Sequence, residues 1–149
     1  MFSGEKWRML IGQYHVKVSS KGRLAFPKKF RDELGDDLVV TVGYEKSLMV
    51  VSKENWQSLV QATQNLPLTN NSARDTNRFI LGQAVEVSLD EQGRFVIPEY
   101  LRQHSKINDN AVFLGLNKYV EVWDKKVWSD HQEYLDANSG EIANRLSNL

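Results

Sequence analysis

Residues 19–31 read SSKGRLAFPKKFR, and residues 90–102 read DEQGRFVIPEYLR. A glycine, two arginines and a proline recur in register, 71 residues apart (Arg23 to Arg94), and apolar residues fill the same positions in both stretches. A repeat of this kind has to be recognised before the fold can be interpreted. The doubled stretch predicts a chain built from two copies of one motif.

Both copies have the same predicted order of elements: a strand, a glycine turn, a short strand, a short helix, two further strands and a longer helix. In the first copy these elements span residues 9–18, 19–22, 23–26, 27–34, 38–43, 47–51 and 53–64. In the second copy they span residues 84–89, 90–93, 94–97, 98–104, 111–115, 119–123 and the residues after 124. Ser52 and Asp124 are favourable N-cap residues for the two longer helices, and a linking helix is expected over residues 73–81.

Each copy has about 55 residues, which is small for an independent core. The two copies are therefore expected to pack about a pseudo-two-fold axis and to share one interior, giving an α+β fold with short helices and a C-terminal helix. The predicted organisation is a basic N-terminal arm (1–8), a first repeat with connecting helices (9–80), a second repeat (81–136), and a polar tail or terminal helix (137–149).

The composition narrows the possible functions. The chain of 149 residues has no cysteine, and its three histidines lack ligand spacing, so we expect no disulfide and no metal site. The sequence contains no nucleophile elbow, P-loop or Rossmann glycine pattern, so neither an enzyme nor a cofactor is predicted. The apolar runs are too short for a signal peptide or a membrane span, which favours the cytoplasm.

Charge is distributed unevenly along the chain although the formal net charge is zero. Residues 1–31 carry eight basic side chains against the single acidic Glu5, whereas the rest of the chain carries 11 basic and 18 acidic residues. Such asymmetry indicates an anionic partner for the basic segment. The alternative is that the basic excess pairs with the acidic remainder, within one chain or between chains.

The repeated motif resembles the MraZ family, of the AbrB/SpoVT-like superfamily. The resemblance covers about residues 9–136 and is carried by Met9–Tyr14, Lys21–Leu24, Pro27, Phe30–Arg31, Leu81–Gly82, Asp90, Gly93–Arg94, Ile97–Pro98, Leu101–Arg102, Gly115 and Val122–Trp123. It implies a pseudo-two-fold double-split β-α-β barrel. It also implies a nucleoid-associated bacterial transcriptional regulator that forms closed rings and binds repeated boxes in double-stranded DNA, upstream of its own cell-division and cell-wall operon.

The family signature, Asp-x-x-x-Arg, is intact in the second copy as Asp90 and Arg94, but Ser19 replaces the aspartate in the first copy. An aspartate can accept N–H groups across the turn and pair with the arginine four residues later. Ser19 can make only the weaker turn bond, so Arg23 is expected to keep its charge free. Whether the first turn keeps the family's geometry is left open by this substitution.

Lys28 and Lys29 fall in the first turn of a predicted helix, where the macrodipole disfavours cations, whereas the second copy has Glu99 at the position of Lys28. A nearby phosphate would reverse that cost, and so would an acidic surface of a neighbouring chain. This contrast indicates that the first copy contacts DNA, and that the second is structural or makes subunit contacts.

The predicted DNA-binding residues are Lys17, Lys21, Arg23, Lys28 and Lys29, with Arg94 a secondary candidate that could equally pair with Asp90. The predicted turn residues are Ser19, Gly22, Asp90 and Gly93. Arg31 and Arg102 are expected to make structural ion pairs. A second hypothesis remains: a non-enzymatic protein-interaction module, either antitoxin-like or a scaffold whose basic end docks an acidic partner.

Overall fold

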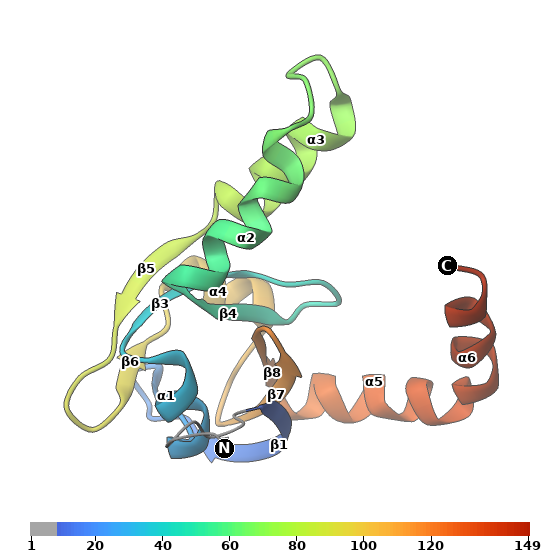
Figure 1. Ribbon diagram of the computed structural model, residues 1–149. Helices are drawn as coiled ribbons and strands as arrows, with labels where there is room; N and C mark the ends of the chain where they lie inside the picture. Colours follow the sequence, from blue (N-terminus) through green and yellow to red (C-terminus); the bar gives the residue numbers. More distant parts are fainter. Residues whose placement is uncertain (1–8) are drawn as a thin grey trace, which may run out of the picture.

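The structure is a computed structural model and describes residues 9–149, so the predicted arm of residues 1–8 lies outside the described residues. Its larger sheet is antiparallel, in the order β1 (Leu10–Lys17), β7 (Asn110–Asn117), β8 (Val120–Asp124), β4 (Leu48–Ser52), β3 (Asp37–Val42) and β5 (Val85–Ser88). The smaller sheet pairs β2 (Arg23–Ala25) with β6 (Arg94–Val96). Together with the helices, these sheets confirm the predicted mixed α+β class (Figure 1).

The two repeats exchange strands. β1, from the first repeat, pairs with β7 of the second, and β5, from the second repeat, pairs with β3 of the first. Exchanging the repeats reverses the order of the larger sheet and leaves it otherwise unchanged. At its centre Met49 lies opposite Glu121, which occupies the equivalent position in the second repeat. The pseudo-two-fold axis therefore passes between these two residues, and neither repeat completes the sheet alone.

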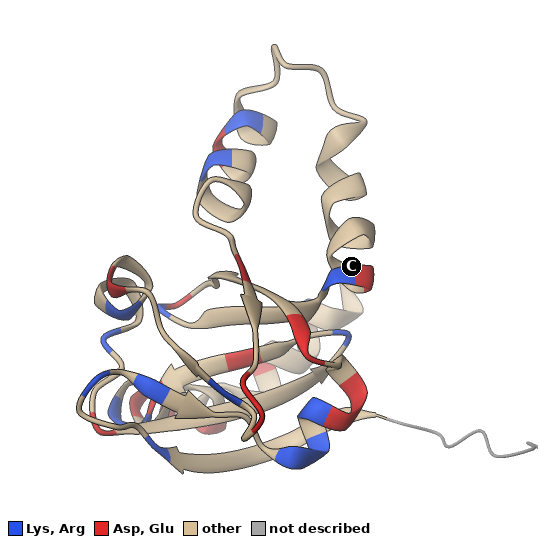
Figure 2. Ribbon diagram, turned by 90° about the vertical axis from the view of Figure 1, so that its left-hand side faces the viewer, with Lys and Arg blue, Asp and Glu red and all other residues tan. Residues whose placement is uncertain are grey.

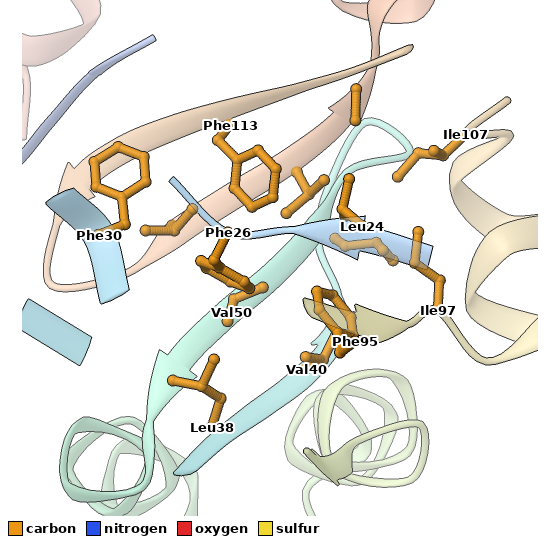
Figure 3. Packing of buried hydrophobic residues seen from close by; sticks show 14 of the residues in the cluster. Leu24, Phe26, Phe30, Leu38, Val40, Val50, Phe95, Ile97, Ile107 and Phe113 are labelled. Atoms are coloured by element: carbon orange, nitrogen blue, oxygen red, sulfur yellow. The ribbon is translucent and has the colours of Figure 1, made fainter. Parts of the chain in front are cut away.

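The shared core lies between the two sheets (Figure 3). Leu24 and Phe95, equivalent residues that face each other across β2 and β6, are 0% and 5% exposed. Phe26 is also buried, with its ring centroid 4.9 Å from that of Phe113. Burial of a large apolar side chain contributes about 1.5–3 kcal/mol, so these contacts between repeats stabilise both copies at once.

The helices begin at or within one residue of the expected positions. α1 (Lys28–Leu34) and α4 (Glu99–Ser105) both begin one residue later than expected, because the proline before each is the N-cap and not the first helical residue. The side chain of Ser52 accepts the N–H of Asn55 at the start of α2 (Lys53–Gln64), and Asp124 caps α5 (Lys125–Ala137). Both predicted N-caps are confirmed.

One expectation about the connecting segments changes. The single helix expected over residues 73–81 is divided into α3 (Asn71–Thr76) and a π-helical segment, η1 (Asn77–Leu81), where the Gly82 N–H donates to the Asn77 carbonyl. The Thr41 hydroxyl donates to the Ile80 carbonyl at 2.5 Å, which gives this wider turn a partner on β3. At the other end, the structure has the second of the two alternatives given for residues 137–149, a terminal helix, α6 (Ser139–Ser147).

Candidate nucleic-acid interface

The first glycine turn, residues 19–22, is closed by three hydrogen bonds. The Ser19 N–H donates to the Arg23 carbonyl at 3.0 Å, and the Gly22 N–H donates to the Ser19 carbonyl at 2.9 Å. The Arg23 N–H donates to Ser19 Oγ at 3.0 Å. Gly22 has a φ of 76°, a conformation that glycine adopts without a Cβ clash. Ser19 thus provides one side-chain acceptor for the turn.

The second turn, residues 90–93, has the same backbone geometry. The Asp90 N–H donates to the Arg94 carbonyl at 3.0 Å, the Gly93 N–H donates to the Asp90 carbonyl at 2.9 Å, and Gly93 has a φ of 74°. Asp90 Oδ1 accepts the N–H of Arg94 at 2.9 Å, as Ser19 Oγ accepts that of Arg23. The serine in the first copy therefore leaves the geometry of the turn unchanged.

The two turns differ in whether their arginine makes an ion pair. Arg94 Nε donates to Asp90 Oδ2 at 3.0 Å, and both side chains are partly exposed. The Arg94 backbone N–H, followed by its guanidinium, holds the pKa of Asp90 below its usual range. Across residues 9–149, Arg23 makes no ion pair, and its side chain is exposed. The first copy therefore presents an uncompensated cation where the second presents an ion pair.

The two arginines lie on one face of the two-stranded ribbon. Successive residues of a strand point to opposite faces, and the central residues of the ribbon, Leu24 and Phe95, point into the core. Arg23 and Arg94 therefore both point outward, each on its own strand and on opposite sides of the pseudo-two-fold axis. The ribbon brings together the primary and the secondary DNA-binding candidates.

The predicted lysines are exposed around the first turn: Lys17 ends β1, Lys21 lies in the turn, and Lys28 and Lys29 begin α1. Lys28 Nζ lies 3.1 Å from Asp32 Oδ2 in an exposed ion pair, so its unfavourable position at the helix start has a local compensation. Acidic segments are interspersed with the basic ones around the sheets (Figure 2). Lys17, Lys21 and Lys29 make no ion pair within the described residues.

Arg31 and Arg102 have a role that the sequence prediction missed. A Cβ built on Gly22 would lie 2.8 Å from Nη1 of Arg102, and one built on Gly93 would overlap the guanidinium of Arg31. Each arginine thus packs on the glycine turn of the other repeat, and Arg102 Nε also donates to the Ile107 carbonyl at 3.1 Å. Neither makes an ion pair within residues 9–149, so that expectation was wrong.

The sequence contains one signal for this arrangement. The helix arginine follows nine positions after the turn glycine in both copies. A repeated glycine to arginine spacing in a pseudo-symmetric fold is consistent with a contact that is made twice. Each turn is therefore fixed by a side chain from the opposite repeat.

No group of three or more histidine, aspartate or glutamate side chains in residues 9–149 could hold a metal ion. Within the same residues, no helix is both long enough and apolar enough to span a membrane.

These features define a class: a tandem-repeat α+β protein with two glycine turns and a shared basic ribbon. Comparison with known proteins identifies the family. The model of the MraZ protein family, described as antitoxin-like, matches residues 9–79 and again 80–148. The chain belongs to the MraZ family, a family of transcriptional regulators rather than enzymes, which confirms both the resemblance and the non-enzymatic prediction.

Relatives in several bacteria match nearly the whole chain, and each is named Transcriptional regulator MraZ. The protein of Caldanaerobacter subterraneus subsp. tengcongensis is 43% identical over 141 residues, covering 95% of this chain and 99% of its own length. The protein of Clostridium tetani is 39% identical over 143 residues, and that of Roseiflexus castenholzii is 36% identical over 141. Both comparisons again cover 95% of this chain and 99% of the relative.

Proposed function

We propose that this chain is a sequence-specific DNA-binding transcriptional regulator that binds repeated promoter boxes of a bacterial division and cell-wall operon as a ring-shaped homo-oligomer. The observation that carries the DNA-binding part is Arg23. Its guanidinium is exposed on the ribbon and makes no ion pair within residues 9–149, whereas the equivalent Arg94 is paired with Asp90. The regulators named among the relatives support the same role.

The ribbon supplies the contact surface in this proposal. A two-stranded ribbon fits the major groove of B-DNA, and an arginine there can bond guanine O6 and N7 together, which discriminates by about 1–3 kcal/mol. Arg23 takes this role, and Lys17, Lys21 and Lys29 contact phosphates that fix the register of the protein on the duplex. Lys28 contributes less because it is paired with Asp32.

Ring assembly supplies the strength that one ribbon lacks. A protomer that neutralises only a few phosphates binds weakly and loses affinity as salt rises. Several ribbons on one ring engage several boxes at once, and the effective concentration of the second contact then raises the overall affinity. In this proposal the strand exchange between repeats forms the double-split barrel of the superfamily, and the protein acts in the cytoplasm at the nucleoid.

A gel-shift titration at two salt concentrations tests the proposed function. Duplexes carrying the repeated promoter boxes should be retained, a duplex with the same bases in shuffled order should bind more weakly, and retention of both should fall steeply at the higher salt. If neither duplex is retained at the lower salt concentration, DNA binding is refuted and the protein-interaction module is favoured.

A further inference from the structure

An apolar groove opens beside α2. It has a volume of about 300 Å³ and lies between α2, η1 and the strands β4 and β8, with Met49, Trp56, Leu59, Val60, Ile80 and Leu81 in its wall. No residue of α2 is buried, and Leu59 is 37% exposed. Because helices in proteins are stabilised mainly by burial of their apolar face, α2 lacks part of the cover that such a helix requires.

The equivalent helix of the second repeat is better covered. Trp128 on α5 is buried against Trp123 on β8, with ring centroids 5.2 Å apart. Val51 occupies the position of Trp123 in the first repeat and has a much smaller side chain. The space beneath α5 is therefore filled from within the chain, whereas the groove beside α2 stays open.

A second uncovered apolar surface lies at the other end of the chain, on α6. Within α6, Ile142 and Leu146 are four residues apart, a spacing that places them on the same side of the helix, and Leu149 follows two residues after the helix ends. Leu146 is 70% exposed, Leu149 is 99% exposed, and no residue of α6 is buried. Such a stripe gains stability only when another surface covers it.

The two surfaces do not meet within one chain. α6 follows α5, whose 13 residues extend about 20 Å at 1.5 Å per residue. Figure 1 shows α5 leading away from the sheets at a wide angle to α2, with α6 at its far end, apart from α2 and α3. A second copy of the chain can bring the two surfaces together.

Charge favours the same pairing. Glu121 lies in the wall of the groove, where burial raises the pKa of its carboxyl group. Arg145 lies three residues after Ile142 and directly before Leu146, next to the apolar stripe of α6. A guanidinium brought beside this carboxylate would compensate a charge that the groove leaves poorly solvated.

We propose that α6 of one protomer docks in the groove between α2 and η1 of the next. The contact joins two different surfaces, so it is heterologous, and repeated contacts of this kind close into a ring or continue as a filament. The inference rests on the proposed function in one respect: it names the contact that builds the proposed ring.

Two surface variants test the contact by mixing. Leu146→Asp places a charge in the α6 stripe and leaves the groove intact. Ala62→Glu places a charged side chain at the groove, on an exposed position of α2, and leaves α6 intact. By size-exclusion chromatography with light scattering, each variant alone should be monomeric, and an equimolar mixture should form dimers and nothing larger, because only one groove and one helix in each pair can join. Glutamate is a good helix former, and far-UV circular dichroism checks that both variants are folded.

Leu68→Asp is the matched control, since Leu68 is 82% exposed and does not line the groove. This variant should keep the wild-type mass. Wild-type mass for Leu146→Asp or Ala62→Glu, or a mixture that stays monomeric, would overturn the contact while leaving the ring possible through other surfaces. A wild-type protein that is monomeric at micromolar concentration would refute the ring itself, and the gel shift described above would still report on DNA binding.

Discussion

Replacing Ser19 by aspartate should give Arg23 the ion pair that Arg94 already has. The two turns share their backbone hydrogen bonds, so the new carboxylate should reach Arg23 Nε as Asp90 reaches Arg94 Nε, at about the 3.0 Å observed there. Both side chains of the existing pair are partly exposed, and exposed pairs contribute about 0.2–1 kcal/mol. Arg23 would have to break this pair before contacting DNA. Ser19→Asp should therefore weaken binding about 1.4- to 5-fold.

The assay is fluorescence anisotropy with a labelled duplex that carries the repeated boxes, at one fixed salt concentration. Ser19→Asn is the matched control, because its side-chain oxygen can accept the Arg23 N–H without adding charge. That control should bind as the wild type does. If Ser19→Asp binds as tightly as Ser19→Asn, or more tightly, the free charge of Arg23 is not what the DNA recognises.

Three further outcomes are expected. Gly22→Ala and Gly93→Ala should each lower Tm by at least 2–8 °C, which corresponds to a left-handed-backbone cost of about 1–2 kcal/mol. Gly93→Ala should lower Tm more, because a Cβ at Gly93 overlaps Arg31 more closely than a Cβ at Gly22 approaches Arg102. Thermal denaturation followed by circular dichroism measures both. Burial raises the pKa of Glu121, so its ionisation opposes folding of a protomer that has no helix docked in the groove. In the Leu146→Asp background, Glu121→Gln should therefore raise the stability at pH 7 in urea titrations, and the difference should vanish below about pH 4. Lys29→Ala should weaken binding to matched and shuffled duplexes alike and reduce the slope of log K against log salt by about 1 for each protomer contact.

Local features of the fold could be predicted from the sequence. The caps Ser52 and Asp124 and the turn glycines act over three or four residues, so residue type alone identifies them. The exposed ion pair of Lys28 and Asp32 also follows from their i, i+4 spacing on a helix. The exposure of Arg23 could be predicted in the same way. Leu24 is the apolar centre of a three-residue strand and points into the core, so the residue before it points outward.

Contacts between the repeats could not be predicted in the same way. Which strand pairs with β1 depends on packing at a distance of about one hundred residues, and nothing in the pattern of β1 distinguishes β7 from β3. The packing of Arg102 on Gly22 depends on the same exchange of strands. The π-helical turn at residues 77–81 depends on Thr41, which lies on another element. In each case tertiary structure decides between alternatives that local sequence leaves equal.

The most direct test compares Arg23→Ala with Arg94→Ala on one duplex of repeated boxes at one salt concentration, with the mass of each variant measured alongside. Arg23→Ala should lose about 1–3 kcal/mol of binding free energy, or roughly 5- to 150-fold in Kd, and keep the mass of the wild type. Arg94→Ala should lose less, because its guanidinium is already paired. A greater loss for Arg94→Ala, or unchanged binding for Arg23→Ala, would contradict the assignment of the first repeat to DNA.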